Sequence, residues 1–456
     1  MNNKQFEAVC QAKTTEILDS TKTPKFKKFK EKKEANLKLC KFAQEVLVIA
    51  ALDLDIEGGE IPNEPHMTGK LLRRIEQCST WVKFAAPEDF SKLKKIEGFV
   101  CSNAFCPVCA AYQSKRDALK LSAIMAAMQD LKNIYNASVA SSQDSMLNAS
   151  VASSQDSMLN ASVASSQDCM LTLRYGEKYA NRPFTKIAAV DGVEFAVFEL
   201  TTPNVTGDKL KAEIVMYAKK FDLLIKNWLV REYPQYLGFA RKLEVTYNKQ
   251  ERITKEMWFG EGKYNKPMKW RFKHMGKKIG DRNPFYNTYH PHYHVVLAVT
   301  PDFFYYDEFG DEKPIISKQI LLAKWKEITG NNDITQVHIQ KAYSTDTGNT
   351  ALEIAKYVAK DTDMLHSPQV LKVFYQALKG AKRLTMGGLF QDTHKLFKEK
   401  QLDRYIPADV TDYVWSVIYS WQGQDFKENK RSELTRVEAA KIRGMKYDEA
   451  NDTDDF

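Results

Sequence analysis

No stretch of the sequence is apolar enough to span a membrane. The longest apolar run, around Val46 to Leu52, falls far short of the ~20 residues that a spanning helix needs. The N-terminal segment lacks the basic-then-apolar order of a signal peptide, and the seven cysteines, an odd number, do not suggest a closed disulfide framework. We therefore expect a cytoplasmic protein with reduced thiols and no membrane partner.

The composition instead favours a folded protein with a polyanionic partner. Hydrophobic residues make up 43% of the 456 positions and charged residues 27%, which excludes a wholly disordered chain. Lys and Arg total 67 against 58 acidic residues, and the formal net charge of +9 favours binding to a polyanion. At ~150 residues per domain, the length suggests about three domains.

Changes in composition divide the chain into six segments. Residues 1–75 are predicted to be a lysine-rich helical extension, either a solvated helix or a phosphate-binding arm. The sequence NASVASSQDSML at 136–147 recurs twice up to residue 171, and we expect an insertion that is either a flexible linker or a marginal helical extension. The other segments are a cysteine-containing region with a helix at 76–135, a mixed α/β domain at 172–365, a helical region at 366–447 and an acidic tail at 448–456.

Four cysteines have the spacing of a metal site. Cys101, Cys106 and Cys109 form a knuckle-like pattern, and Cys78 lies 23 positions earlier. Four thiolates close a tetrahedral shell around Zn²⁺, which stabilises structure and leaves no open position for catalysis. The alternative is that Cys78 is a buried apolar residue, and His66 is a less favoured fourth ligand.

Three histidines alternate along a predicted strand. His290, His292 and His294 fall on one face of the segment 290–299, while Tyr293 and Leu297 point into the opposite layer. Two imidazoles at positions i and i+2 reach one metal ion. The alternative is a polar strand face with histidines exposed to water.

Glu244 is the candidate third ligand. It lies at the centre of a neighbouring predicted strand, where a carboxylate is costly without a cation partner. Two imidazoles and a carboxylate, with positions left open, suit Mn²⁺ or Mg²⁺ bound to a phosphate oxygen. A salt bridge from Glu244 to a lysine is the competing explanation.

The segment ALEIAKYVAKD, residues 351–361, is predicted to be an amphipathic helix. Its polar face carries Glu353, Lys356, Tyr357 and Lys360 at helical spacing. The lysines favour the phenolate form of Tyr357, and Glu353 could accept a proton from the phenol or from water. Tyr357 is therefore a candidate nucleophile, although a tyrosine on such a helix more often serves in packing.

Together these stretches resemble the rolling-circle replication initiators (Rep proteins) of small plasmids from Gram-positive bacteria, in the HUH endonuclease superfamily. The resemblance is carried by FELTTPNV (198–205), GFARKLEVTYN (238–248), NTYHPHYHVVLAV (287–299), DITQVHI (333–339), EIAKYVAKDTD (353–363), FYQALKGAKRL (374–384) and VCSNAFCPVC (100–109). It covers most of the chain except the lysine-rich start, the repeats and the acidic tail.

The resemblance implies a nicking reaction at a plasmid origin. Tyr357 would attack a phosphodiester and become linked to the 5′ phosphate, and the freed 3′ hydroxyl would prime host polymerase. His292 and His294 match the family's metal ligands, Glu244 fits the acidic residue of the upstream strand, and Glu353 matches a glutamate that promotes hydrolysis at termination. Double-strand origin DNA, its single-stranded nick site and a host helicase are the implied partners, and a homodimer is left open.

Two further features bear on this expectation. Glu199 stands where the family usually has an uncharged residue, commonly threonine, in its first strand motif. The segment 266–278 combines aromatic and basic residues suited to single-stranded DNA, or it is only an exposed basic loop. Its candidate DNA-binding residues are Lys269, Arg271, Lys273, Lys277 and Lys278.

We therefore predict an α+β fold in which an HUH nuclease domain has a central antiparallel sheet, with helices on one face and the tyrosine helix across the two metal-bearing strands. An N-terminal zinc-binding region and a C-terminal helical region complete the chain. The alternatives are an HUH transposase or mobilisation relaxase, and a non-enzymatic zinc-containing DNA-binding repressor.

Overall fold

The computed structural model describes residues 24–46, 67–151, 192–262, 264, 267–342 and 361–444. Side chains are described in the same ranges except at 24–25, 131–151 and 361. None of the helices in these ranges combines the length and hydrophobicity that a bilayer crossing requires.

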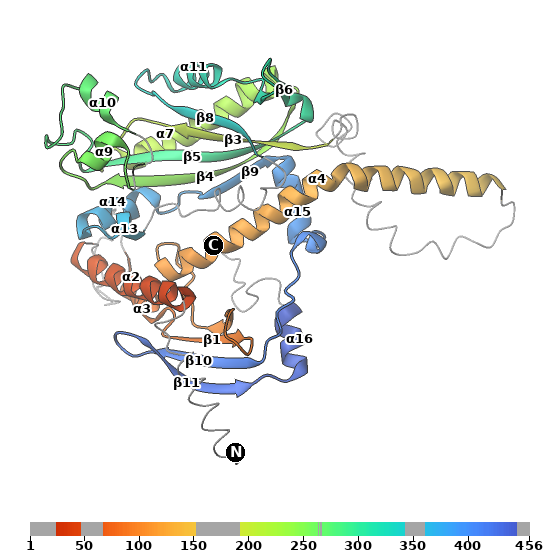
Figure 1. Ribbon diagram of the computed structural model, residues 1–456, viewed down its shortest axis with the longest axis horizontal. Helices are drawn as coiled ribbons and strands as arrows, with labels where there is room; N and C mark the ends of the chain where they lie inside the picture. The colour runs from red at the N-terminus through yellow and green to blue at the C-terminus, as the bar shows by residue number, and fades with distance from the viewer. Residues whose placement is uncertain are drawn as a thin grey trace, which may run out of the picture. The chain divides into compact units, whose positions relative to one another are not determined.

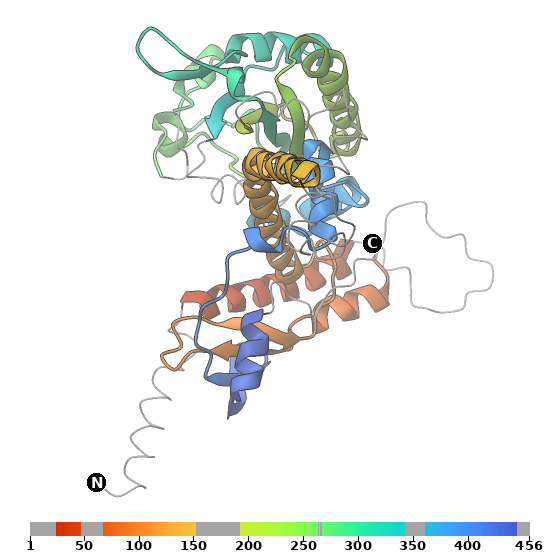
Figure 2. The same cartoon turned by 90° about the vertical axis from the view of Figure 1, so that its right-hand side faces the viewer.

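The chain forms two compact units. The first comprises Met1–Arg116, Ala359–Gly380 and Pro407–Phe456, and the second comprises Asp117–Val358 and Ala381–Ile406. Each unit is built from segments far apart in sequence, and each contains an antiparallel sheet with helices (Figures 1 and 2). The predicted α+β class is confirmed.

The second unit is built on a five-stranded antiparallel sheet. Its strand order is β8-β3-β5-β4-β9, so the strands predicted to carry the histidines and Glu244 are neighbours. Alternating valine, tyrosine, phenylalanine and leucine favour extended backbone in the long strands. The bounds are Glu194–Thr201 for β3, Tyr236–Asn248 for β4, Thr288–Val299 for β5, Val337–Ala342 for β8 and Leu384–Gly388 for β9.

One face of this sheet packs against helices α7 and α11. Tyr293 of β5 stacks on Tyr217 of α7 with ring centroids 4.6 Å apart, and Trp325 of α11 lies 5.2 Å from the Tyr217 ring. The Trp325 indole also donates a hydrogen bond to the Thr201 carbonyl at 3.0 Å. The helices span Leu210–Leu223 for α7, continued by η2 (Leu224–Leu229) and α8 (Val230–Glu232), and Lys318–Thr329 for α11.

Helices also cover part of the opposite face. Leu121, Ile124 and Met128 of α4 (Pro107–Val151) form a hydrophobic core with Phe195 and Val296 of the sheet. Helix α15 (Leu389–Lys398) joins the same core. The prediction of helices on one face is therefore wrong. The sheet face that carries the histidines, called the histidine face below, also has an apolar half, and helices α4 and α15 pack against it (Figure 1).

Short elements complete the second unit. Two short helices lie between β4 and β5, where the basic segment falls, three short elements follow between β5 and β8, and one 3-10 helix follows α15. Their bounds are Lys255–Phe259 for α9, Lys269–His274 for α10, Pro301–Phe303 for η3, Phe304–Tyr306 for β6, Glu312–Pro314 for β7 and Asp403–Tyr405 for η5.

The first unit contains a four-stranded antiparallel sheet of order β11-β10-β1-β2. Phe26 of helix α2 packs among Phe84, Tyr419 and Phe426 of this sheet. The lysine-rich helix is therefore part of a core. The bounds are Pro24–Val46 for α2, Gly69–Gln77 for α3, Trp81–Ala86 for β1, Lys94–Gly98 for β2, Trp415–Trp421 for β10 and Phe426–Glu433 for β11.

The segment 366–447 is not wholly helical, and that prediction is wrong in part. It contains helices α14 (Pro368–Leu378), α15 and α16 (Arg436–Gly444), but also strands β9, β10 and β11. The alternating sequence WSVIYSW of β10 pairs with β1, more than 300 residues earlier, and this partner stabilises the extended conformation. Helix α13 (Asp361–Met364) precedes α14.

Helix α4 continues into the repeats. It begins at Pro107, directly after Cys106, and ends at Val151, so it includes the whole first copy and the start of the second. Of the two alternatives for the repeats, this part of the segment is a helical extension. The rest of the repeats, including Cys169, lies outside the described residues.

Candidate active site

The polar half of the histidine face brings ionisable side chains from three strands together. On β5, His290, His292 and His294 share this face, as predicted, while Tyr293 points to the α7 side. Strand β4 places Glu244 directly opposite His292. The side chains of both strands therefore alternate as predicted, and the imidazoles and the carboxylate lie on one face of the sheet.

The imidazoles of His292 and His294 converge on one carboxylate oxygen. Glu244 Oε2 lies 2.9 Å from His294 Nε2 and 3.3 Å from His292 Nε2. Burial alone would raise the pKa of Glu244, which is only 6% exposed, but hydrogen bonds from the two histidines outweigh it and lower the pKa. Glu244 is thus held as a carboxylate, and no lysine of the described residues forms a salt bridge with it.

Hydrogen bonding orients His292. Its Nδ1 lies 3.4 Å from the His290 carbonyl oxygen and its Nε2 lies 3.3 Å from Glu244 Oε2, so both ring nitrogens have an oxygen partner that fixes the ring orientation. His290 itself stacks on His292 at 5.4 Å and stands beside the converging group rather than within it. Burial and the charge on His292 lower its pKa to about 4, so it is neutral at physiological pH.

Glu199 of β3, which in the sequence stands out only as a departure from the family pattern, also belongs to this group. Its carboxylate and the ring nitrogens of His292 and His294 all lie within 4.8 Å of one another. The sequence feature that could have identified Glu199 is the alternation of β3, which places its side chain on the same face as His294, the residue paired with it on β5. That register is a non-local property, which the sequence alone does not supply.

The donor set fits a divalent cation. Two imidazoles and two neighbouring carboxylates form a largely buried cluster, and nitrogen and oxygen donors of this kind hold Mn²⁺ or Mg²⁺. The residues of the histidine face thus fit a metal site.

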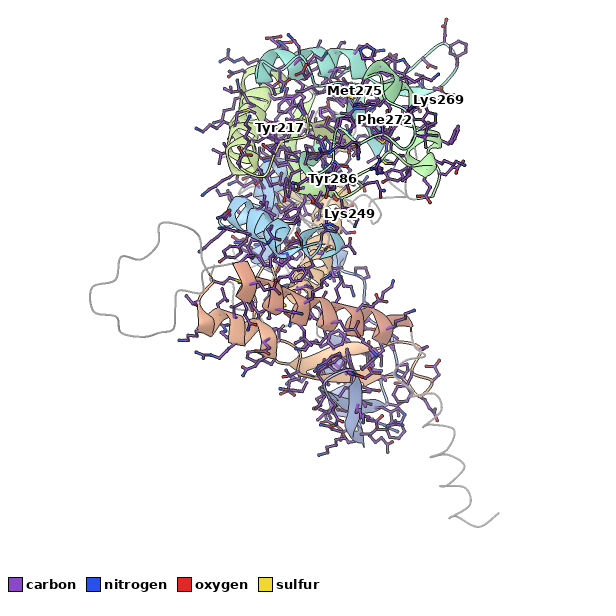
Figure 3. All side chains as sticks on the ribbon, turned by 90° about the vertical axis from the view of Figure 1, so that its left-hand side faces the viewer. Tyr217, Lys249, Lys269, Phe272, Met275 and Tyr286 are labelled. Atoms are coloured by element: carbon purple, nitrogen blue, oxygen red, sulfur yellow. The ribbon has the colours of Figure 1, made fainter. Side chains whose placement is uncertain are left out.

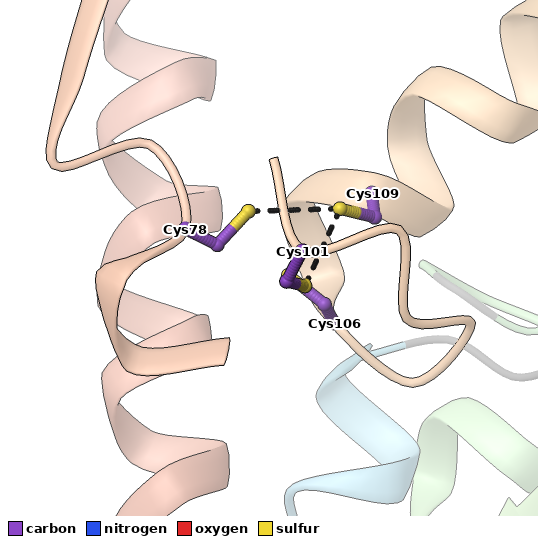
Figure 4. A group of neighbouring side chains, drawn as sticks. All are labelled: Cys78, Cys101, Cys106 and Cys109. Atoms are coloured by element: carbon purple, nitrogen blue, oxygen red, sulfur yellow. Dashed lines mark hydrogen bonds between the residues drawn. The ribbon is translucent and has the colours of Figure 1, made fainter. Parts of the chain in front are cut away.

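A second cluster is formed by the four predicted cysteines in the first unit. The Sγ atoms of Cys78, Cys101, Cys106 and Cys109 all lie within 4.8 Å of one another, and Cys109 Sγ is 3.6 Å from Cys78 Sγ and 3.5 Å from Cys101 Sγ (Figure 4). Hydrogen bonds from the neighbouring thiols lower the pKa of Cys78. Cys78 comes from the end of α3 and Cys109 from the start of α4, so a metal bound here would join two helices.

Helix α2 packs directly behind this cysteine cluster. The fully buried Lys33 donates hydrogen bonds from Nζ to the carbonyl oxygens of Glu76 (2.6 Å) and Cys78 (2.7 Å). Asn36 donates to the Ile75 carbonyl at 2.6 Å and its Oδ1 accepts from Cys106 Sγ at 3.7 Å. Two polar residues of the lysine-rich segment thus donate hydrogen bonds to the backbone carbonyls at the end of α3 and hold this end beside the cysteine cluster.

Comparison with known proteins decides the family. A model of replication proteins, Rep_1, matches residues 178–427, more than half of the chain. The chain belongs to the Rep_1 family of replication proteins. This confirms the family predicted from the sequence, and the matched range includes the histidine face of the second unit.

Curated relatives of this replication family are similar over most of their length. A protein rep of Staphylococcus aureus is 27% identical over 300 residues, 66% of this chain and 86% of the relative. Proteins rep of Streptococcus pneumoniae serotype 2 and Bacillus amyloliquefaciens are each 22% identical, covering 75% and 72% of this chain and 77% and 73% of the relatives. No solved structure matches the chain significantly.

The basic segment of this family member contains an exposed aromatic platform. Trp270 of α10 is 77% exposed and stacks on His274 with centroids 5.5 Å apart and planes 8° apart. Phe272 is fully buried and stacks on Trp258, which anchors the helix. Lys269, Lys273 and Lys278 are exposed around it, Lys277 is half-buried, and Arg271 lies 4.0 Å from the Phe285 ring (Figure 3 labels Lys269, Phe272 and Met275).

The predicted tyrosine helix is not among the residues that the structure describes. Glu353, Lys356, Tyr357 and Lys360 fall within 343–360, and their place relative to the histidine face stays a prediction. His66, the less favoured cysteine-site ligand, also lies outside the described residues.

Proposed function

We propose that this protein initiates plasmid replication in the cytoplasm by nicking one strand of the origin, as an HUH endonuclease. The proposal rests on one observation: in a member of the replication-protein family, His292 and His294 converge on Glu244 from adjoining strands. A bound Mn²⁺ or Mg²⁺ at these three residues supplies Lewis acidity toward the scissile phosphate.

Tyr357 is the proposed nucleophile. Its phenol oxygen attacks phosphorus, the bond to the 3′ oxygen breaks, and the 3′ hydroxyl leaves as a primer for polymerase. The 5′ phosphate stays on the tyrosine, so the bond energy is conserved for rejoining. Lys356, the residue before Tyr357, and Lys360, three residues after it, stabilise the phenolate and the phosphate charge.

Glu353 is the proposed base at termination. It lies one turn before Tyr357 and can accept a proton from the water or hydroxyl that attacks the phosphotyrosine. Glu353→Gln should therefore still nick and should accumulate a covalent protein–DNA adduct, visible as a shifted band after denaturing electrophoresis. Equal release of product by the variant and the wild type would remove this role.

The α10 platform is the proposed contact for the single-stranded nick site. Base stacking on Trp270 is tolerant of sequence, and Lys269, Lys273, Lys277, Lys278 and Arg271 supply positive charge for the backbone. Binding to double-strand origin DNA, recruitment of host helicase and polymerase, and pairing of two copies are expectations carried by the family resemblance.

The cysteine cluster is proposed to hold structural Zn²⁺. All four ligands are thiols, three of them buried, which suits a closed tetrahedral site without a catalytic position. Its contribution would be to fix α3 and α4 in the first unit.

Supercoiled origin plasmid tests the proposed reaction. With Mn²⁺ or Mg²⁺, wild type should convert it to the nicked form, and both Tyr357→Phe and His294→Ala should not. Glu194→Gln, on β3 but facing away from the histidines, is the matched control and should nick normally.

Nicking that survives Tyr357→Phe would exclude Tyr357, and binding without nicking by wild type would favour the zinc-containing repressor. A transposase or mobilisation relaxase would instead cut a transposon end or transfer origin in preference.

A further inference from the structure

The histidine pair is flanked by carboxylates on both sides. Glu199 of β3 lies opposite His294, and Glu244 of β4 lies opposite His292, with β5 between them. The two carboxylates therefore approach the imidazoles from opposite edges of one strand. Glu194, the other acidic residue of β3, falls on the opposite face by alternation.

Glu199 has no other partner in the described parts of the chain. It forms no ion pair or side-chain hydrogen bond there, yet it is half-buried next to two imidazole nitrogens. A carboxylate that loses part of its hydration without a cation or a donor is costly. Glu244 contacts the same two imidazoles from the other side, and a divalent cation held among these groups would offset the charge of both carboxylates.

The basic residues in register with Glu199 have other partners. His338 of β8 lies directly opposite Glu199, and its Nε2 is 3.0 Å from Gln340 Oε1. Lys242 of β4 lies opposite His294, in the same cross-strand row as Glu199. Its Nζ pairs with Asp117 Oδ2 of α4 at 3.3 Å, and both side chains are buried. Lys242 therefore neutralises Asp117 rather than Glu199, and no lysine or arginine in the described strands of this sheet forms an ion pair with Glu199.

We propose that Glu199 is a fourth protein ligand of the metal site, alongside His292, His294 and Glu244. This inference rests on the proposed function, because it assigns a residue to the same metal. Four protein donors leave two positions of an octahedral ion open for phosphate oxygen and water, as Mn²⁺ and Mg²⁺ require. The same four donors complete the tetrahedral shell of Zn²⁺ and leave it no open position.

The direct test measures Mn²⁺ affinity without any DNA reaction. Protein with its cysteine site loaded with zinc is titrated with Mn²⁺, and free Mn²⁺ is followed by its EPR signal. Glu199→Gln should bind Mn²⁺ about 10- to 100-fold more weakly than wild type. Glu199→Thr, which suits a strand, should show the same loss and separates ligand removal from misfolding.

Controls distinguish this inference from the proposed function. Glu194→Gln changes the same residue type on the same strand and should bind Mn²⁺ like wild type. If both Glu199 variants also bind like wild type while Glu244→Gln binds weakly, Glu199 is not a ligand, and the nicking proposal stands. If wild type binds no Mn²⁺, both proposals fail.

A second measurement tests the coordination argument. Zn²⁺ should displace Mn²⁺ from the wild-type site, releasing the EPR signal, and should block Mn²⁺-dependent nicking. In Glu199→Thr the tetrahedral shell regains an open position, so Zn²⁺ should inhibit nicking less. Inhibition by Zn²⁺ that is equal in wild type and Glu199→Thr would overturn the four-ligand arrangement.

Discussion

At the scale of single residues, the second unit depends on buried charges that are paired across elements. Lys242 of β4 and Asp117 of α4 are both buried and lie 3.3 Å apart. Burial lowers the pKa of Lys242, and the charge on Asp117 opposes that effect. Since Lys242 is two residues before Glu244, this pair also fixes the strand that carries a proposed metal ligand.

We expect Asp117→Asn to destabilise the protein by about 3 kcal/mol, because it leaves the Lys242 ammonium buried without its partner. Urea unfolding, followed by a probe of the second unit, measures the change. Lys120→Met is the matched control: it removes a more exposed cation that contacts the same carboxylate, and should cost less than about 1 kcal/mol. Equal effects of the two variants would contradict the importance of the buried pair.

Residues whose role depends on local periodicity could be predicted from the sequence. The shared face of His292 and His294 follows from alternation alone, because a strand has a period of two. Glu244 was a candidate because a carboxylate at the centre of a strand is costly without a partner, and the register between β4 and β5 places it opposite His292. Glu199 could not be placed, since its position beside His294, 95 positions later in the sequence, depends on the register between β3 and β5. Lys33 was hidden in a lysine-rich run, where composition gives no sign that one ammonium is buried.

At the scale of elements, short segments are fixed by a few contacts that the sequence does not reveal. Strand β10 was predicted to be helical because its β1 partner is remote, and helix α2 was predicted to be an extension because its phenylalanines were not connected to β11. In the basic segment, one short helix buries Phe272 and exposes Trp270, and the sequence does not show which of the two aromatic side chains is free to contact DNA.

The α10 platform gives a prediction for DNA binding. Trp270→Ala should weaken binding of a single-stranded oligonucleotide by about 1–3 kcal/mol, because it removes one base-stacking surface. Fluorescence anisotropy with a labelled origin oligonucleotide measures the affinity. Tyr306→Ala removes another exposed aromatic from a different hairpin and should have no effect. An equal loss in both variants would argue against a specific platform.

Asp409 predicts a pH dependence for the first unit. Burial would raise its pKa, but bonds from Lys92, Thr411, Lys94 and Tyr413 outweigh this and lower the pKa. A carboxyl whose folded pKa is depressed contributes stability above its unfolded pKa of ~4 and loses it as the pH falls further.

Asp409→Asn should therefore lower the melting temperature at pH 7, and the difference from wild type should shrink below about pH 4. Thermal melts over a pH series measure this trend. Asp412→Asn, at a neighbouring exposed carboxylate, should show little difference at any pH. A gap between Asp409→Asn and wild type that stays constant through the acid range would contradict the linkage.

At the scale of the whole molecule, the two proposed metal sites belong to different units. The cysteine cluster lies in the first and the histidine face in the second. Thiolates prefer zinc, whereas a mixed imidazole and carboxylate site accepts manganese or magnesium, so each site can be emptied selectively.

A chelator that removes zinc should increase hydrogen exchange in α2, α3 and β1 while leaving β3, β4 and β5 protected, because all four cysteines lie in the first unit. Exchange followed by mass spectrometry on the full chain measures it, with Cys106→Ser expected to reproduce the pattern without chelator. Equal loss of protection in both sheets would show that the units do not respond separately.

The hydrogen bonds of Lys33 have a practical consequence for the most basic part of the chain. An amine that donates to two backbone carbonyls and is sealed from water cannot react with an acylating reagent, whereas exposed Lys27 and Lys38 on the same helix can. The acylation yield at Lys33, read against its neighbours, would thus report when the helix detaches from the thiol cluster behind it.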